Sequence, residues 1–220
     1  MKSVFRASLL CLIGLSLAGC NSLTQTSAET LVRAVKGPPP LLSIDDVNTA
    51  ARPLLLISYE QSEGSLGSPN PDQPVTEWHG LKQMLVMHNG RMVQSAGLPL
   101  DADMQQELAA DDPFVTGLLN VPDGLRVERQ IDFPRRHLTG LTQIATYSRG
   151  REETIEIMGE DRQVQRIDEA VRIPALDFRT NNRYWVDINT GEVLRSRQTL
   201  LPDLSPMTLT LLRPTTGGQP

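Results

Sequence analysis

Cys20 carries the clearest chemistry in this sequence. It ends the run Leu17-Ala18-Gly19-Cys20, which resembles the bacterial lipobox that lipoprotein signal peptidase cleaves before the cysteine. A thiolate is the nucleophile that accepts a diacylglyceryl group, and small residues ahead of it fit a protease groove. Lys2 and Arg6 precede an apolar run over residues 8–18, which is too short to span a membrane. This arrangement is typical of a signal peptide that ends in a lipidated cysteine.

The acyl chains expected on Cys20, palmitate among them, predict where the protein resides. Two or more chains anchor a protein stably at a membrane, whereas one chain binds only marginally. Asn21 follows the cysteine in place of the Asp that signals inner-membrane retention in enteric bacteria. We therefore expect an outer-membrane lipoprotein whose body faces the periplasm. The predicted parts are a signal peptide over residues 1–19, the lipidated cysteine and a flexible tether over 20–40, a β domain over 41–213 and a polar tail over 214–220.

Groups that support metal or nucleophilic catalysis are sparse after Cys20. His79, His88 and His137 are not spaced as metal ligands, and the other cysteine, Cys11, leaves with the signal peptide. The run 64–67 has adjacent Gly and Ser, which breaks the G-x-S-x-G spacing of a nucleophile elbow. We therefore predict no catalytic residue, no metal and no cofactor.

Carboxylates leave one enzymatic alternative open. A glycosidase needs only two carboxylates about 5–10 Å apart. Glu152, Glu153 and Glu156 are candidates, although a charged strand face in water is the better explanation of them. A glycan-acting enzyme whose carboxylates are unlocated thus stays as an alternative.

Arginine and aromatic residues gather near the C-terminal end. Arg195 and Arg197 are two apart, so on a strand they project from one face, and Tyr184 and Trp185 lie on the expected partner strand. Arginine binds carboxylates in two places and aromatic rings stack on sugars, so these four residues are candidates for glycan or partner binding, with acidic polysaccharide as one ligand. Pairing of the arginines with the chain's own acids, and packing of the rings in the core, is the alternative reading.

Composition narrows the class of partner. The chain of 220 residues carries 21 Lys and Arg against 26 Asp and Glu, a net charge of −5. Nucleic-acid binders neutralise phosphates with clustered basic residues, so this balance argues against nucleic acid as a partner. A hydrophobic content of 39% is ordinary for a globular domain with its own core.

The elements that must position these residues are short strands. Residues 125–133 alternate cleanly, with an apolar row that Arg129 interrupts, which predicts a half-buried antiparallel strand. About nine strands at near-regular spacing indicate a mainly β fold, an antiparallel meander curled into a half or closed barrel. Strands are expected over 54–59, 81–88, 91–96, 138–148, 153–158, 163–173, 183–188, 192–200 and 207–212.

Turns and breaks separate the strands. Asn89-Gly90 and Asn189-Thr190-Gly191 predict hairpin turns, because Asn89, Gly90 and Gly191 tolerate positive φ. Residues 61–74 are rich in Gly, Pro and Ser and predict a long loop. Ser43 can cap a short helix that ends before Pro53. One main covering helix is expected over Asp101–Ala110, because Asp101 can cap it and Met104 and Leu108 share a helical face.

Two stretches resemble a known family. One stretch is residues 90–99, and the other is the run Arg183-Tyr184-Trp185-Val186-Asp187-Ile188-Asn189-Thr190-Gly191-Glu192-Val193-Leu194-Arg195-Ser196-Arg197-Gln198, which is followed by Pro202. Both resemble the YjbF/GfcB family of bacterial lipoproteins. That family is associated with operons for exopolysaccharide or group 4 capsule production. The resemblance implies a predominantly antiparallel β fold, polysaccharide-export proteins as partners and no established catalytic residues.

Three hypotheses follow. The first is a non-enzymatic outer-membrane lipoprotein that assists exopolysaccharide or capsule production and export by binding polymer or by scaffolding a partner. The second is a lipid or lipoprotein carrier with an apolar cavity, and the third is the glycan-acting enzyme. The lining of any cavity separates the first two, because a carrier needs a large apolar concavity.

Overall fold

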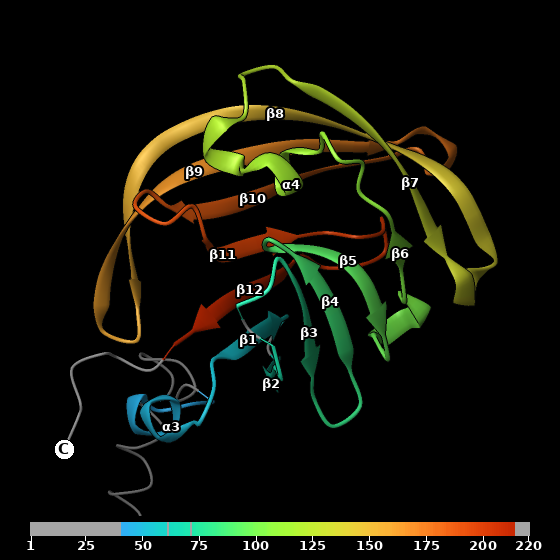
Figure 1. Ribbon diagram of the computed structural model, residues 1–220. Helices are drawn as coiled ribbons and strands as arrows, with labels where there is room; N and C mark the ends of the chain where they lie inside the picture. The colour runs from blue at the N-terminus through green and yellow to red at the C-terminus, as the bar shows by residue number, and fades with distance from the viewer. Residues whose placement is uncertain (1–40, 61, 71, 214–220) are drawn as a thin grey trace, which may run out of the picture. The chain divides into compact units, whose positions relative to one another are not determined.

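The computed structural model describes residues 41–60, 62–70 and 72–213, which form a closed antiparallel barrel of twelve strands (Figure 1). Neighbours pair in the order β1-β12-β11-β10-β9-β8-β7-β6-β5-β4-β3-β2, and β2 returns to β1. The predicted mainly β fold is therefore confirmed in its closed form. The predicted signal peptide, Cys20, tether and polar tail lie outside the described residues. The strands are β1 (Leu54–Tyr59), β2 (Ser62–Gly67), β3 (Val75–His79), β4 (Met84–His88), β5 (Arg91–Ala96), β6 (Gln105–Gln106), β7 (Arg126–Phe133), β8 (Leu138–Ile157), β9 (Glu160–Ile173), β10 (Phe178–Asp187), β11 (Val193–Gln198) and β12 (Met207–Leu212).

β1 closes the barrel because both of its edges are paired. Leu54 lies opposite Leu212 of β12 on one edge and opposite Gly67 of β2 on the other. β1 therefore offers no row of unpaired backbone groups that another chain could extend. Among the described residues, no helix is long and apolar enough to cross a membrane.

The two predicted hairpin turns are confirmed. Asn89 and Gly90 both have positive φ, 46° and 87°, the conformation of a type I′ turn between β4 and β5. In the turn between β10 and β11, Gly191 has a φ of 76°, and Asp187 Oδ1 accepts hydrogen bonds from the backbone N–H groups of Asn189 and Thr190. These turns place residues 89–90 and 189–191 beside one cavity, which is described below.

The helix predicted over Asp101–Ala110 is wrong. The 3-10 turn η1 (Pro99–Asp101) is followed by β6, where Gln105 lies opposite Gln94 of β5 and opposite Asp132 of β7. Asp101 does not cap a helix, because its φ is positive, 54°, and its Oδ1 accepts a hydrogen bond from Arg135 Nε at 2.8 Å. The need to bridge β5 and β7 outweighs the helical propensity of the segment.

The described residues instead contain two short helices. α3 (Ile44–Thr49) is the predicted short helix, with Ser43 as its N-cap in a capping box completed by Asp46. α4 (Pro113–Thr116) begins after the N-cap Asp112. The one-turn 3-10 helices are η1, η2 (Leu118–Asn120), η3 (Pro134–Arg136) and η4 (Pro174–Leu176).

The predicted loop over residues 61–74 is partly wrong as well. Its first half forms β2, which pairs along its whole length with β1, while it meets β3 at the single pair Gly67 and His79. Backbone pairing therefore orders a sequence whose side chains have little strand preference. β8 also runs without a break across the two strands predicted there, with a bulge between Arg149 and Glu152.

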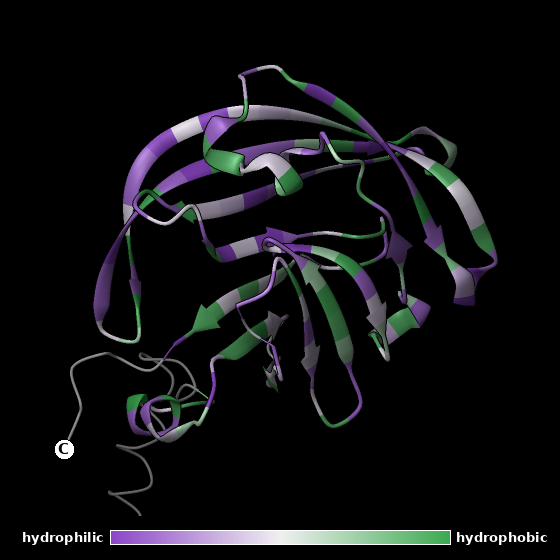
Figure 2. Cartoon of the chain, viewed as in Figure 1, coloured by the Kyte–Doolittle hydropathy of each residue, from purple (hydrophilic) through white to green (hydrophobic). Residues whose placement is uncertain are grey.

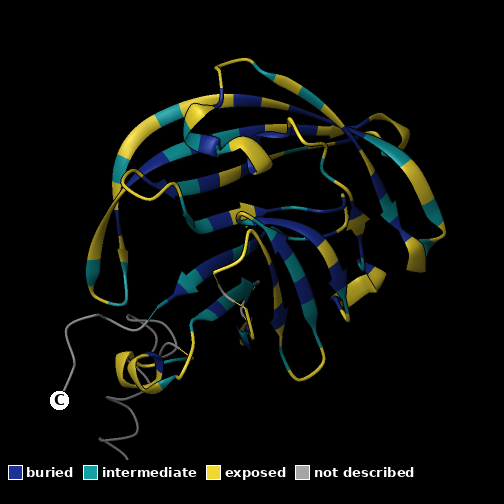
Figure 3. Ribbon diagram, in the orientation of Figure 1, coloured by how far each residue is buried: buried dark blue, intermediate teal, exposed yellow. Residues whose placement is uncertain are grey.

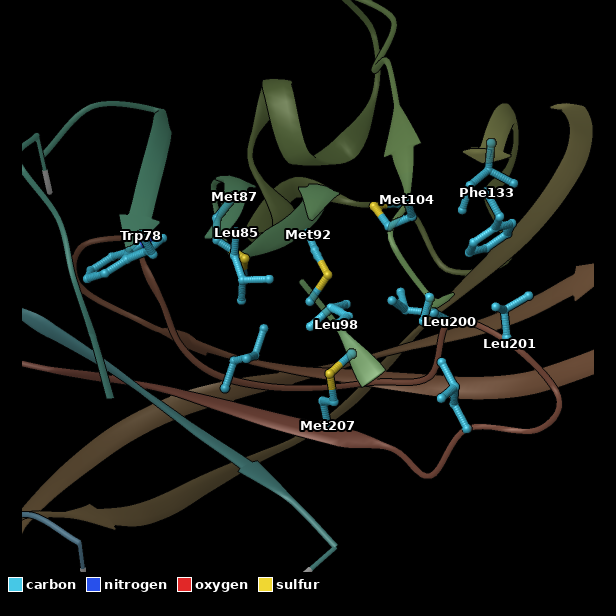
Figure 4. Packing of buried hydrophobic residues seen from close by; sticks show 14 of the residues in the cluster. Trp78, Leu85, Met87, Met92, Leu98, Met104, Phe133, Leu200, Leu201 and Met207 are labelled. Carbon is cyan, nitrogen blue, oxygen red and sulfur yellow. The ribbon is translucent and has the colours of Figure 1, made fainter. Parts of the chain in front are cut away.

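The core lies inside the barrel in two clusters. Buried and exposed residues alternate along β7 to β10, and hydrophilic residues are interleaved with hydrophobic ones on the same strands (Figure 3, Figure 2). The larger cluster, part of which Figure 4 shows, includes Trp78, Leu85, Met92, Met104, Phe133, Leu201 and Met207. The smaller cluster consists of Phe114, Leu118, Val121, Ala145, Tyr147, Ile167, Val171, Tyr184 and Val186.

Candidate functional site

The segment formed by α4 and η2, residues 113–120, lies in the barrel interior, and we call it the plug. Figure 1 shows α4 on the concave side of β8, β9 and β10, and Phe114 and Leu118 pack there against Tyr147 and Tyr184. Asn89 of the β4–β5 turn donates its side-chain N–H to the Phe114 carbonyl at 2.6 Å. The plug, rather than the expected helix over 101–110, is the element that fills the barrel.

Four charged side chains meet beneath the plug. Arg91 Nη1 and Arg129 Nη1 lie 2.8 Å and 2.9 Å from Glu169 Oε1. Arg129 Nε also donates to Asp112 Oδ2 at 2.6 Å, and Asp112 is the N-cap of α4. All four residues are buried. Two cations and two carboxylates balance one another, so this interior charge cluster (Arg91, Asp112, Arg129 and Glu169) is neutral.

The Glu169 carboxylate is saturated with donors. Besides the arginines, Oε1 accepts the Tyr147 hydroxyl at 2.9 Å, and Oε2 accepts Asn182 Nδ2 at 3.0 Å and the Tyr184 hydroxyl at 3.1 Å. Every buried side-chain nitrogen and oxygen of the described residues has a hydrogen-bond partner. A carboxylate in this state has no free lone pair with which to attack or deprotonate a substrate.

The Glu169 carboxylate and the two tyrosine hydroxyls that contact it each keep one protonation state near neutral pH. Burial on its own raises the pKa of Glu169, but Arg91, Arg129 and the hydrogen bonds outweigh it and lower that pKa to about 2. Burial, together with the charge of Glu169, raises the pKa of the Tyr147 and Tyr184 hydroxyls far above neutral pH. These groups therefore exchange no proton near neutral pH, and the cluster serves to hold the plug.

Phe114 separates this cluster from a cavity. Its ring lies 5.3 Å from Arg91 Cζ and 5.8 Å from Arg129 Cζ, and it meets the Tyr184 ring edge-on with centroids 4.8 Å apart. Phe114 also lines the cavity. The arginines are thus covered by an aromatic face at this point.

The cavity has a volume of about 750 Å³ and is lined by β1, β3, β4, β11, β12 and the plug. We call it the mouth cavity. Its buried lining residues include Leu55, Trp78, Met87, Leu118, Ser196 and Leu209. Its exposed lining residues include Gln73, Asn89, Asn120, Asn189 and Thr190. The mouth cavity thus combines an apolar wall with a polar rim.

The binding residues predicted from the sequence divide between two faces. Trp185 lies opposite Arg195, and Arg183 lies opposite Arg197, on the outside of β10 and β11. Tyr184 points the other way, into the smaller core cluster. The structure therefore brings Trp185, Arg195 and Arg197 together and separates Tyr184 from them. We call Arg183, Trp185, Arg195 and Arg197 the outer hairpin face.

Part of the outer hairpin face is internally paired. Arg183 Cζ lies 5.6 Å from the Trp185 ring centroid, and Trp185 Nε1 donates to Glu153 Oε2 at 3.1 Å. Arg195 donates to Thr210 Oγ1 at 3.3 Å and to a backbone carbonyl of β8 at 2.9 Å. Arg197 is exposed and makes no hydrogen bond or ion pair with the described residues. Arg197 is the member most available to a partner.

The carboxylates considered for catalysis lie along one strand, β8. Glu153 forms an ion pair with Arg166 at 2.8 Å, and hydrogen bonding from Trp185 is the main cause of its lowered pKa. Glu152 and Glu156 are exposed, and none of the three lines the mouth cavity. Within residues 41–60, 62–70 and 72–213, no group of three or more His, Cys, Asp or Glu side chains is placed to hold a metal ion.

Sequence reasoning missed the interior charge cluster, although a signal for it exists. Arg129 interrupts an inward row of Val127, Ile131 and Phe133, and Glu169 interrupts the inward row of Ile167, Val171 and Ile173. Opposite charges that each replace one member of an apolar row predict a buried ion pair when their strands lie close.

Comparisons with known proteins agree with the fold. A family model described as "Group 4 capsule polysaccharide lipoprotein gfcB, YjbF" matches residues 28–212. A protein of Escherichia coli strain K12 described as "Uncharacterized lipoprotein GfcB" is 28% identical over 95% of this chain and 99% of its own length. The crystal structure of the hypothetical lipoprotein YmcC from E. coli K12 superposes with a TM-score of 0.68 at 23% identity, covering 79% of this chain and 90% of that one.

Proposed function

The chain belongs to the YjbF family of group 4 capsule polysaccharide lipoproteins, and on that premise we propose that it assists exopolysaccharide or capsule production and export without catalysing a reaction. The mouth cavity carries the proposal, because a walled cavity of about 750 Å³ with a polar rim is suited to holding a ligand. The saturated Glu169 carboxylate beneath it supports binding rather than acid–base chemistry.

The outer hairpin face supplies the second half of the proposal, contact with other polysaccharide-export proteins. Trp185 and Arg197 lie on the outside of adjacent strands, and arginine and tryptophan are the residue types that contribute most to protein interfaces. Acidic polysaccharide is the other partner that this face suits, since Arg197 has no internal counter-ion among the described residues.

The proposed location is the outer membrane, with acyl chains on Cys20 and the barrel in the periplasm. The lipobox and Asn21 support this location. Replacing Cys20 by Ala should release the protein from the membrane fraction, measured by immunoblot after membrane separation. If the variant still fractionates with the outer membrane, the lipid-anchor proposal fails.

Deletion of the gene tests the proposed function. We expect surface polysaccharide, quantified by uronic-acid and total-hexose assays on washed cells, to fall well below the parent level and to recover with the wild-type gene. An unchanged amount would contradict the proposed function.

The outer hairpin face is tested by Arg195→Ala with Arg197→Ala. This double variant should reduce surface polysaccharide while the protein stays folded and present at normal level. The matched control is Arg126→Ala with Arg162→Ala, which removes two arginines that pair only with neighbouring glutamates on their own strands. Equal polysaccharide in both variants would rule out this face as the partner surface.

A further inference from the structure

We propose that the mouth cavity binds an uncharged, hydroxyl-rich segment of a glycan. The inference rests on the proposed function, since it names the ligand class for the same cavity. Three properties of the lining carry it: an indole N–H without a partner, amide side chains without partners, and the lack of a free cation among the described lining residues.

Trp78 gives the first observation. Its side chain lines the mouth cavity and is only 4% exposed. Its indole N–H has no acceptor among the described residues, although every fully enclosed side-chain nitrogen in them has a partner. The Trp78 N–H is therefore not fully enclosed, and the side chain that carries it lines the cavity. Buried indoles normally find an acceptor, so a ligand oxygen is the group that the site lacks.

The amide side chains at the rim give the second observation. Asn120 and Asn189 line the cavity from η2 and from the β10–β11 turn. Neither side chain makes a hydrogen bond to the rest of the described residues. Each amide both donates and accepts hydrogen bonds, which matches a sugar hydroxyl, a group with the same dual capacity.

The charges of the lining give the third observation. Arg213 is the only cation among the described residues that line the cavity. Its Nη1 lies 3.1 Å from Asp72 Oδ1 and its Nη2 lies 2.6 Å from Glu192 Oε1, and both of these acids also line the cavity. A carboxylate or phosphate ligand would have to compete with two acids for one guanidinium. The described lining residues therefore offer no free cation and carry one acid more than they have cations, which favours an uncharged ligand over an acidic sugar or an anionic lipid headgroup.

The apolar wall completes the fit. Trp78 lines the cavity with an aromatic ring that is not fully enclosed, and sugar rings stack on such surfaces through their C–H faces. Phe114 also lines the cavity but is fully buried, so it supports the wall and offers no stacking surface of its own. The interior charge cluster fixes Phe114 from behind, and the Asn89 side chain holds its carbonyl. The wall is therefore formed before the ligand arrives, which lowers the entropic cost of binding.

Fluorescence of Trp78 provides the test. The chain has two tryptophans, so Trp185→Phe leaves Trp78 as the only reporter. The full-length lipoprotein carrying this change is reconstituted in phospholipid vesicles and titrated with three probes. Two are oligosaccharides released from the strain's surface polysaccharide by partial acid hydrolysis and separated by anion exchange into uncharged and acidic fractions. The third is dodecanoate.

We expect a saturable change in Trp78 emission with the uncharged fraction. Asn120→Leu with Asn189→Leu keeps the side-chain size but removes the amides, and should weaken this binding at least tenfold. The matched control Asn181→Leu, an exposed asparagine of β10 outside the mouth cavity, should bind as the parent does. Circular dichroism checks that each variant is folded.

Three results would overturn the inference. They are no saturable response to the uncharged fraction, tighter binding of the acidic fraction, and saturable binding of dodecanoate alone, which would instead favour a lipid carrier. None of them alters the outcome of gene deletion, so failure of the ligand class is distinguishable from failure of the proposed function.

Discussion

Replacing Glu169 by Gln should destabilise the barrel severely. The change keeps the shape of the side chain but removes the charge that balances Arg91 and Arg129 and leaves only Asp112 for two buried guanidinium groups. It also turns one acceptor of the saturated carboxylate into a donor that faces other donors. Removing one partner of a buried ion pair costs about 3–5 kcal/mol. For a unit of this size that loss corresponds to a fall in Tm of roughly 6–20 °C.

Urea unfolding followed by circular dichroism measures this loss. Glu128→Gln is the matched control, because Glu128 pairs with Arg126 at the surface, where both side chains are 53% exposed, and such pairs contribute about 0–1 kcal/mol. Adding Arg91→Gln to Glu169→Gln leaves Arg129 paired with Asp112. The double variant should therefore be more stable than the sum of the single losses predicts, by about 0.5–3 kcal/mol. A cost below about 1 kcal/mol for Glu169→Gln, or strictly additive losses, would refute the reasoning.

Three further predictions concern the pH dependence of Glu169, the anchoring of the plug by Phe114 and the close packing of the β4–β5 turn. The pKa of Glu169 in the folded protein, about 2, lies below its ordinary value of 4.5. Its stabilising contribution is therefore complete above about pH 4.5 and is lost as the pH falls toward 2. Urea midpoints measured across this range should fall less steeply for Glu169→Gln than for the parent. Phe114→Ala should cost about 3–5 kcal/mol in urea unfolding, because the ring is fully buried, and a loss under about 1 kcal/mol would mean that the plug is not anchored there. Gly90→Ala should lower Tm more than Gly124→Ala, since both have positive φ but a Cβ on Gly90 would lie 2.3 Å from Val193 Cβ whereas none lies within 4 Å on Gly124; equal shifts would contradict the close approach of the two turns.

The strand pattern of the barrel was predictable where one face is consistently buried. Residues 125–133 alternate because β7 has one side in the core, and the two hairpin turns follow from Asn and Gly at positions of positive φ. Closure was not predictable, because β2 is ordered by backbone pairing with β1 and its sequence has little strand preference. Pairing of that kind depends on a distant strand rather than on local residues.

The error over residues 101–110 has a specific physical origin. Met104 and Leu108 are four apart, a spacing that fits one face of a helix and also one face of an extended strand. In the structure, Ala102, Met104 and Gln106 are buried in alternation, which is the period of an extended chain. Two apolar residues four apart cannot distinguish a helical period from an extended one. The segment is extended because its residues must pair with β5 and β7.

The candidate site was predictable only on its outer side. Arg195 and Arg197 share a face because they are two apart on a strand, a local rule that holds in any sheet. The mouth cavity combines β1, β3, β4, β11, β12 and the plug, segments up to some 150 residues apart in the sequence. Residues such as Trp78 and Asn120 acquire a shared role only after the barrel closes.

The most direct measurement is the surface polysaccharide of a strain whose only copy of the protein carries Asn120→Leu with Asn189→Leu. A strain with Asn181→Leu serves as the control, and immunoblots confirm equal protein levels in the outer membrane. We predict that the cavity variant loses most of the polysaccharide that gene deletion removes, while the control keeps the parent amount. A full amount of surface polysaccharide in the cavity variant, with the deletion strain deficient, would contradict the assignment of the mouth cavity as the site through which this lipoprotein acts.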